Sequence, residues 1–217
     1  MPILGAILAV LAVIGIVTAI LSGDSSSNIA DTSVESAKGQ ANQIVQDMSK
    51  IKTAFEMQMV KNTLAPTLIS FKGIKLDGTN TPVDSTNPEY QVFHPTSGSI
   101  SPVPLPPASS MVGSATREYV VSKQNVLKGD TNSTDLGTAA ADWVVAVADI
   151  SQTTCQQLNK MIHNDTTIPT SGVAVTAFTG ATGGNVVTAP AGTSARAMGC
   201  VGVTGSKYVA YQTLRAQ

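Results

Sequence analysis

Residues 34–55, VESAKGQANQIVQDMSKIKTAF, place an apolar residue at regular three- and four-residue intervals. The apolar positions are Val34, Ala37, Ala41, Ile44, Met48, Ile51 and Phe55, and mostly polar residues stand between them. This spacing predicts an amphipathic helix with one narrow apolar seam. We expect the helix to continue through Met59 and to end before Pro66, because the residue preceding a proline is biased away from helix.

The apolar seam has two alternative partners. About three heptads with alanine at two seam positions make a weak autonomous coiled coil. We therefore expect the seam to pack on the sheet of its own domain. Contact between helices of different subunits is the second alternative.

The chain before this helix is strongly apolar. Ile3–Leu21 contains no charged residue, and at about 1.5 Å per residue such a helix crosses most of a bilayer's ~30 Å core. A cleaved signal peptide is disfavoured, because no Lys or Arg precedes the run and its exit lacks an Ala-x-Ala-like site. A membrane anchor and an assembly helix remain as interpretations.

Composition limits the classes of function. The net charge is −1 and 12% of the residues are charged, so no electrostatic argument for nucleic acid or an acidic substrate exists. Without the N-terminal helix, the length suits one domain of about 150 residues. Abundant Ala, Val, Thr and Gly indicate small-residue packing and favour an extracytoplasmic protein that contains a sheet.

The chain has two cysteines, Cys155 and Cys200, and they lack the CxxC spacing typical of metal sites. A disulfide is the natural interpretation, because the N-terminal membrane signal places the domain outside the reducing cytosol. A bridge that closes a loop of roughly 45 residues is worth about 4 kcal/mol on the entropy model. Two buried free thiols are the alternative.

The rest of the chain predicts an irregular connection followed by a small antiparallel sheet. Residues 66–116 hold most of the proline and are expected to form a long irregular connection, in which PTSGSISPVPLPPASS (95–110) in particular cannot be a central strand or a helix. Strand-like runs follow at Arg117–Ser122 and Ala141–Ile150, and Ser151 is a candidate N-cap for a short helix over 152–163 that carries Cys155 on one face with Leu158 and Ile162. Four more strand-like runs are expected at 172–180, 185–192, 197–203 and 206–214, the last two as a hairpin around Thr204–Ser206.

We therefore expect an α+β fold in four parts. They are an apolar membrane or assembly helix (1–23), an amphipathic helical half (24–65), a Pro-rich connection (66–116), and an antiparallel sheet with a short helix and a disulfide-bounded C-terminal region (117–217).

This organisation resembles that of type IV pilins and pseudopilins, in particular the larger class b pilins. The sequence ISQTTCQQLNKMI (150–162), followed by GCVGV (199–203), is similar to the C-terminal disulfide-bounded region of that family, and Met1 is acceptable as its first mature residue. One position departs from the pattern: Gly5 stands where the family typically has a glutamate that neutralises a neighbour's N-terminal amine. Pro2 is compatible with the start of a helix, whose first N–H groups lack partners.

The resemblance implies a structural role. The chain would be stored in the inner membrane, polymerise with itself with the help of a pilus assembly machinery, and end in an extracellular filament at the cell surface. The assembly helix would include Met1, Ile3, Leu4, Gly5, Ile7, Leu8, Leu11, Ile14 and Gly15.

No motif indicates catalysis, a cofactor or a metal. His94 and His163 are isolated, and HExxH, GxSxG and phosphate-binding loops are absent from the sequence. Asp130, Asn132 and Thr134 begin like a calcium loop, but Asp135 replaces its glycine and Ala141 its final glutamate. Asn132 and Asn164 each satisfy Asn-x-Ser/Thr and are candidate glycosylation sites, with a plain polar turn as the alternative.

Two hypotheses of different class follow. The first is a filament-forming structural subunit, and the second is a monomeric, membrane-anchored extracytoplasmic binding module, which accounts better for Gly5. An enzyme is not expected, because the sequence lacks convergent reactive groups.

Overall fold

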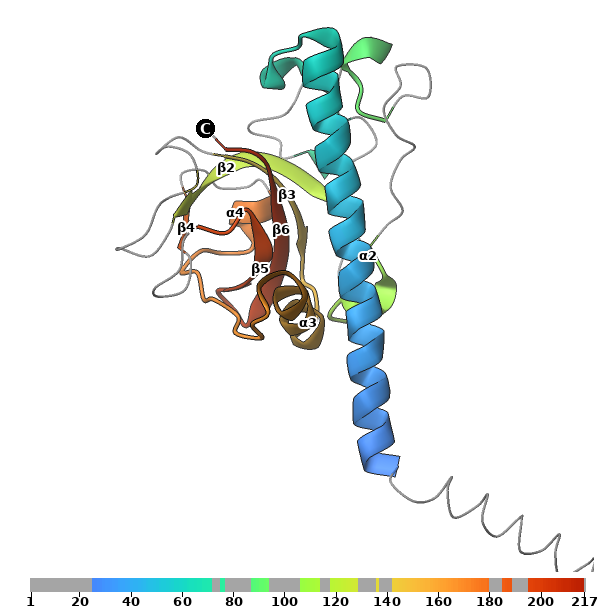
Figure 1. The fold of residues 1–217 in the computed structure, drawn as a ribbon. Coiled ribbons are helices and arrows are strands. Elements are labelled where there is room, and N and C mark those ends of the chain that lie inside the picture. Colours follow the sequence, from blue (N-terminus) through green and yellow to red (C-terminus); the bar gives the residue numbers. More distant parts are fainter. Residues whose placement is uncertain are drawn as a thin grey trace, which may run out of the picture. The chain divides into compact units, whose positions relative to one another are not determined.

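The computed structural model describes residues 25–71, 75–76, 87–93, 106–113, 118–128, 136, 142–179, 185–188 and 195–216. The chain divides into two compact units, Met1–Ser36 and Ala37–Gln217. The fold is α+β (Figure 1). The predicted N-terminal part, residues 1–23, lies outside the described residues. Within the described ones, no helix is long and apolar enough to cross a membrane.

Helix α2 (Ser25–Asn62) confirms the amphipathic helix predicted from the spacing. It ends at Asn62, before the left-handed Thr63 (φ 52°) and ahead of Pro66. From Ala37 onward the predicted seam is buried, with every member at most 4% exposed. Val34, in the first unit, is 39% exposed, so the buried seam begins at Ala37 and not at Val34. The interval pattern therefore predicted both the helix and its inward face within the second unit.

Six strands form one sheet in the second unit. They are β1 (Lys75–Leu76), β2 (Val120–Lys128), β3 (Asp142–Ala148), β4 (Asn185–Thr188), β5 (Met198–Val203) and β6 (Lys207–Arg215). The order is β1-β2-β3-β6-β5, and β4 also pairs with β2. The central pairs β2–β3, β3–β6 and β6–β5 are antiparallel, as expected. The short strands β1 and β4 join β2 in parallel, which was not predicted.

Both faces of the sheet are buried. One face packs against α2 and the helix α3 (Gln152–His163), and its cluster includes Ile44, Ile51, Phe55, Val145 and Cys155. The other face packs around Phe178 of the short helix α4 (Thr176–Thr179), in contact with Val144, Val201 and Tyr211 among others. Apolar side chains therefore alternate between the two clusters along β3, β5 and β6, as the two-residue period of a strand requires.

A bulge in β2 changes the face that its side chains occupy. Ser122 pairs with Val144 and Asn125 with Asp142, so three steps along β2 match two along β3. One extra residue reverses the inward face of a strand. Val121 accordingly belongs to the α2-side cluster and Leu127 to the α4-side cluster. The bulge explains why Val121 and Leu127, which are six positions apart and would otherwise share a face, lie in different clusters.

The segment 172–180 corrects a sequence expectation. Its run of Val and Phe was interpreted as a strand, but the described part forms the single helical turn α4. Phe178 is completely buried, and its backbone N–H donates to the carbonyl of Val175. Burial of one aromatic ring against the sheet decides the local structure here, because a strand would need a partner edge.

The other expectations for the C-terminal half are largely confirmed. Helix α3 starts after Ser151, whose Oγ accepts from the backbone N–H of Thr154. Strands β5 and β6 form the predicted hairpin, with Val203 opposite Lys207. Strand β2 begins at Val120 and extends to Lys128, so the predicted span of 117–122 was too early and too short.

The connection over 66–116 is irregular in its described parts apart from the two-residue edge strand β1. It contains three short 3-10 turns, Pro66–Leu68, Pro88–Tyr90 and Ala108–Ser110. Ser70 bridges Gln91, and Met111 bridges Ile150.

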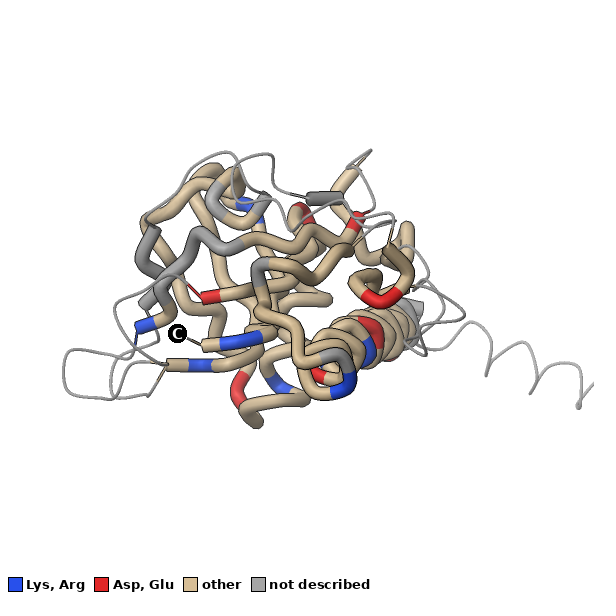
Figure 2. Tube along the Cα trace, turned by 90° about the horizontal axis from the view of Figure 1, so that it is seen from above, with Lys and Arg blue, Asp and Glu red and all other residues tan. Residues whose placement is uncertain are grey.

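Figure 2 shows charged positions of both signs scattered among a large majority of uncharged ones.

Phe55 tests the packing of α2 on the sheet. Its ring stacks on Phe71 at a centroid distance of 5.6 Å and lies 6.2 Å from the ring of Trp143. We predict that Phe55→Ala lowers the free energy of unfolding by about 3–5 kcal/mol, because it leaves a cavity in a packed core. Val60, which is 82% exposed on the same helix, gives the matched control, since Val60→Ala should change stability by less than about 0.5 kcal/mol. Urea unfolding followed by the fluorescence of the chain's one tryptophan measures both, and equal effects would contradict the packing.

Candidate functional site

The predicted disulfide is present at the junction between α3 and β5. Cys155 and Cys200 are bonded, with their Cα atoms 5.4 Å apart, and both residues are at most 1% exposed. The N-cap Ser151 starts α3 one turn before Cys155, so local capping positions the cysteine toward the sheet. The bond therefore joins the short helix to the outermost antiparallel strand.

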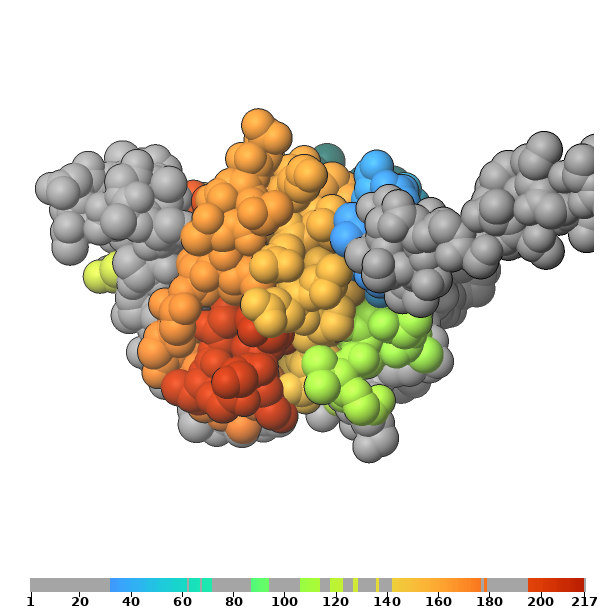
Figure 3. Space-filling view, turned by 90° about the horizontal axis from the view of Figure 1, so that it is seen from below, coloured from blue at the N-terminus to red at the C-terminus, as the bar shows by residue number. Residues whose placement is uncertain are grey.

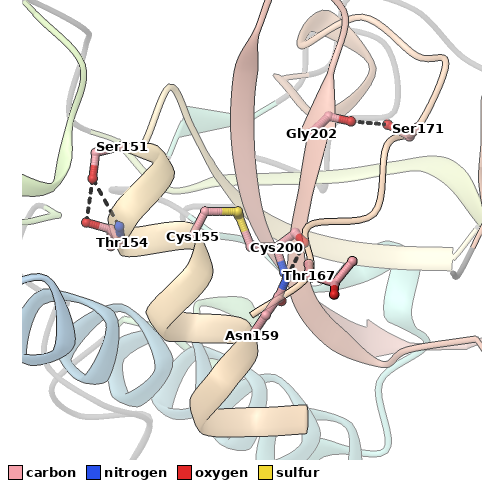
Figure 4. Close-up of a disulfide and its surroundings, with 8 residues drawn as sticks. All are labelled: Ser151, Thr154, Cys155, Asn159, Thr167, Ser171, Cys200 and Gly202. Carbon is pink, nitrogen blue, oxygen red and sulfur yellow. Dashed lines mark hydrogen bonds between the residues drawn. A yellow bond between two sulfur atoms is a disulfide. The ribbon is translucent and has the colours of Figure 1, made fainter. Parts of the chain in front are cut away.

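Asn159 lies one turn after Cys155 and binds the same strand through its amide (Figure 4). Its Oδ1 accepts from the backbone N–H of Cys200 at 2.8 Å. Its Nδ2 donates to the carbonyls of Cys200 at 2.9 Å and of Thr167 at 3.0 Å. Asn159 is fully buried, so these bonds satisfy an amide that would be costly to bury unpaired.

The outer edge of β5 is occupied along its length. The carbonyl of Met198 lies 2.8 Å from His163 Nε2. The N–H of Gly202 donates to the carbonyl of Pro169, and the carbonyl of Gly202 accepts from Ser171. Together with the Asn159 bonds at Cys200, these contacts pair the carbonyl of Met198 and both outward backbone groups of Cys200 and Gly202 with α3 or with the segment after it. Figure 3 shows this segment (orange) packed beside the hairpin (red) and α3 (gold).

His163 lies at the end of α3, as predicted. The helix dipole favours a cation at this end, but the pKa of His163 is lowered, which favours the neutral ring. Burial lowers the pKa of His163 below its ordinary 6.5, and the positive charge of Arg196 acts in the same direction. The hydrogen bond to Met198 and the negative charge of Asp165 oppose these effects. Because a carbonyl can only accept, Nε2 carries the proton of the neutral ring.

Asn164 is exposed at the left-handed C-cap of α3, with φ 54°. The next residue, Asp165, accepts from the backbone N–H of Thr167 at 2.8 Å, and this bond is the main cause of its lowered pKa. Asp165 also faces Arg196 at 3.7 Å. Asn164 therefore stands on an ordered turn at the surface, and its glycosylation stays a prediction.

A second polar cluster lies under α2. Asp47 is 2% exposed and accepts from the hydroxyl of Tyr119 at 3.2 Å. Lys50, one turn along the helix, donates to the other carboxylate oxygen at 3.3 Å. Burial and the Asp47 carboxylate raise the pKa of Tyr119 well above 10.0, so the hydroxyl keeps its proton and donates it. The cluster joins α2 to the residue before β2.

Several predicted residues lie outside the described part of the chain. They are the assembly-helix residues from Met1 to Gly15, together with His94, Asp130, Asn132 and Thr134. Among the residues that are described, no group of three or more His, Cys, Asp or Glu side chains could hold a metal ion.

Sequence reasoning missed Asn159 and the Asp47–Tyr119 pair. Asn159 follows Cys155 by four positions and therefore shares its helical face, which was a usable signal. For Asp47, the only signal was its place beside the seam member Met48, and its partner is far away in the sequence.

No family model, curated protein or solved structure matches this chain.

The lowered pKa of His163 predicts a pH dependence of stability. Below about pH 6.5 the unfolded chain binds a proton that the folded chain resists, so stability falls as the pH decreases from there toward the folded pKa. We expect the urea midpoint of the wild type to decrease over this window more than that of His163→Gln. The difference between the two proteins cancels the contribution of His94. Parallel curves would contradict the burial effect.

The Tyr119 hydroxyl provides a separate test. We predict that Tyr119→Phe lowers the free energy of unfolding by about 2 kcal/mol, because the buried Asp47 carboxylate loses a donor. Tyr90, half-buried in the surface turn Pro88–Tyr90, is the control, and Tyr90→Phe should cost less than about 0.5 kcal/mol. Indistinguishable urea curves for the two variants would show that the Asp47 bond is not stabilising.

Proposed function

We propose that this chain is the structural subunit of an extracellular helical filament of the type IV pilus kind, assembled through its apolar N-terminal run. The observation that carries the proposal is the burial of the α2 seam. Ala41, Ile44, Met48, Ile51 and Phe55 are completely buried within their own unit. The amphipathic half of the helical region is therefore not free for association between subunits. The remaining long apolar surface of the sequence is the run Ile3–Leu21.

The run has the composition that close helix association requires. Small residues recur along it at Gly5, Ala6, Ala9, Ala12, Gly15 and Ala19, and small residues let neighbouring helices approach closely. Burying about 1,000 Å² of apolar surface contributes roughly 25 kcal/mol before association costs. Repeated head-to-tail contacts that do not close give an open helical polymer.

The pilin resemblance supports the same function through its C-terminal region. The disulfide between Cys155 and Cys200 joins the two segments that carry the resemblance. The proposal includes storage in the inner membrane, delivery by an assembly machinery and display at the cell surface.

A membrane-anchored binding module is the second candidate, and Gly5 favours it. A filament subunit with Gly5 must pack without the charge pairing that is typical of the family, whereas an anchor needs only the apolar length. The two candidates differ in whether the chain polymerises.

Gly15→Leu separates the candidates, because it preserves an apolar span but fills a position that permits close helix contact. We predict that cells with the wild-type chain yield fibres containing it in sheared surface material, and that Gly15→Leu loses the fibres while the chain stays in the membrane fraction. Ile14→Leu is the matched control and should retain fibres. Electron microscopy with antibody labelling measures the result.

Two outcomes would contradict the proposal. The filament itself is contradicted by a wild-type chain found only as membrane-bound monomers, and its assembly through close helix contact at Gly15 is contradicted by fibre formation that Gly15→Leu leaves unchanged. Mass spectrometry of the native N-terminus also distinguishes the filament subunit from the membrane anchor. A methylated Met1 trimmed from a longer precursor supports the filament, and an unprocessed initiator methionine supports the anchor.

A further inference from the structure

The outer edge of β5 needs hydrogen-bond partners that the disulfide alone does not provide. An edge strand offers unpaired N–H and C=O groups to any other strand. The Cys155–Cys200 bond fixes one side chain of β5 but leaves the backbone of Cys200 to find its own partners. In this protein those partners are the two ends of the Asn159 amide.

The Asn159 side chain imitates a neighbouring strand. It accepts from the N–H and donates to the C=O of the same residue, Cys200, which is the pair of bonds that an adjacent antiparallel residue would make. Its second amide proton binds the carbonyl of Thr167 and holds the segment that continues along the edge. That segment then pairs with Gly202 through Pro169 and Ser171. One residue of α3 thus starts the closure of the whole described edge.

We propose that Asn159 is a non-covalent latch that keeps α3 and the closed edge on β5 independently of the disulfide. The latch and the disulfide act on the same residue through different atoms, because Asn159 binds the backbone of Cys200 and Cys155 binds its side chain. Loss of the disulfide in the folded protein therefore leaves the edge closed. Loss of both frees β5 to pair with the β5 edge of a second copy of this chain. The inference does not depend on the filament proposal.

His163 is the second contact of α3 with this edge, and Gly199 makes room for it. A Cβ at Gly199 would lie 3.3 Å from His163 Nε2 and 3.5 Å from Asn159 Oδ1. Gly199 therefore lets His163 approach β5 closely, because a Cβ there would push the ring outward by a few tenths of an ångström, while its contact with Asn159 would be an ordinary one. Fully buried, Asn159 is shielded from water, which would otherwise compete for the Cys200 backbone groups.

Hydrogen–deuterium exchange of backbone amides in the full chain tests the latch at single residues. In a Cys155→Ala/Cys200→Ala variant, we expect the amide of residue 200 to stay protected within a few-fold of the wild type. In Asn159→Leu with the disulfide intact, we expect its exchange to rise roughly tenfold or more. Lys160→Ala, an exposed neighbour on α3, is the control and should leave it unchanged. The amide of Val145 in the central strand β3 reports global unfolding. Its exchange rate should not change when the edge of β5 opens.

Combining the three substitutions adds a second readout. The variant that lacks both the disulfide and Asn159 should form dimers or larger species by light scattering, and each parent should not. If Asn159→Leu does not fold, the cysteine variant alone decides the question. A residue 200 amide that loses protection in that variant, while Val145 keeps it, overturns the latch. An unchanged amide in a folded Asn159→Leu overturns it as well.

Discussion

The burial of the α2 seam against the sheet is the constraint on which the rest of the second unit depends. Ile44, Ile51 and Phe55 cover one face of a sheet whose central strands are apolar on both faces. A strand buried on both faces needs two covers, and a single helix supplies only one. Helix α3 extends the first cover, and the one-turn helix α4 places Phe178 on the second. The bulge in β2 then distributes the side chains of a single strand between the two cores.

Much of this arrangement could be predicted from the sequence because it follows from period and from local capping. The three- and four-residue spacing gave α2 and its inward face, and Ser151 gave the start of α3. The turn residues Thr204–Ser206, with Gly205 between them, predicted the β5–β6 hairpin. What escaped prediction depends on partners distant in the chain. The bulge between Ser122 and Asn125 produces no recognisable pattern in the sequence. The parallel pairing of β4 with β2 depends on how two distant strands align. The helical turn at Phe178 places the aromatic ring against the second face of the sheet, where it is buried.

The candidate site divides in the same way. The pairing of Cys155 with Cys200 could be predicted because the chain has two cysteines, and the apolar N-terminal run favours a compartment in which disulfides form. The spacing of four from Cys155 places Asn159 on the buried face of α3, but the spacing does not say that its amide binds the Cys200 backbone. Its role becomes visible only when β5 is known to be an edge strand. The Asp47–Tyr119 pair is similar, because a buried carboxylate on α2 needs donors, and these come from Lys50 and from Tyr119, the residue before β2.

The closed edge of β5 and the proposed assembly mode also constrain each other. A protein that forms filaments must favour one kind of contact between its copies over all others. In the filament proposal that contact is between apolar helices, whose association the small residues of Ile3–Leu21 permit. An open strand edge would offer a competing contact, because strand addition between copies needs only unpaired backbone groups. Pairing of the Met198 carbonyl and of both outward groups of Cys200 and Gly202 within the same unit blocks that competitor along most of the described edge. If the filament proposal holds, a folded subunit could then be stored in a membrane without associating through its sheet, and the apolar run would be the part of the chain that assembles.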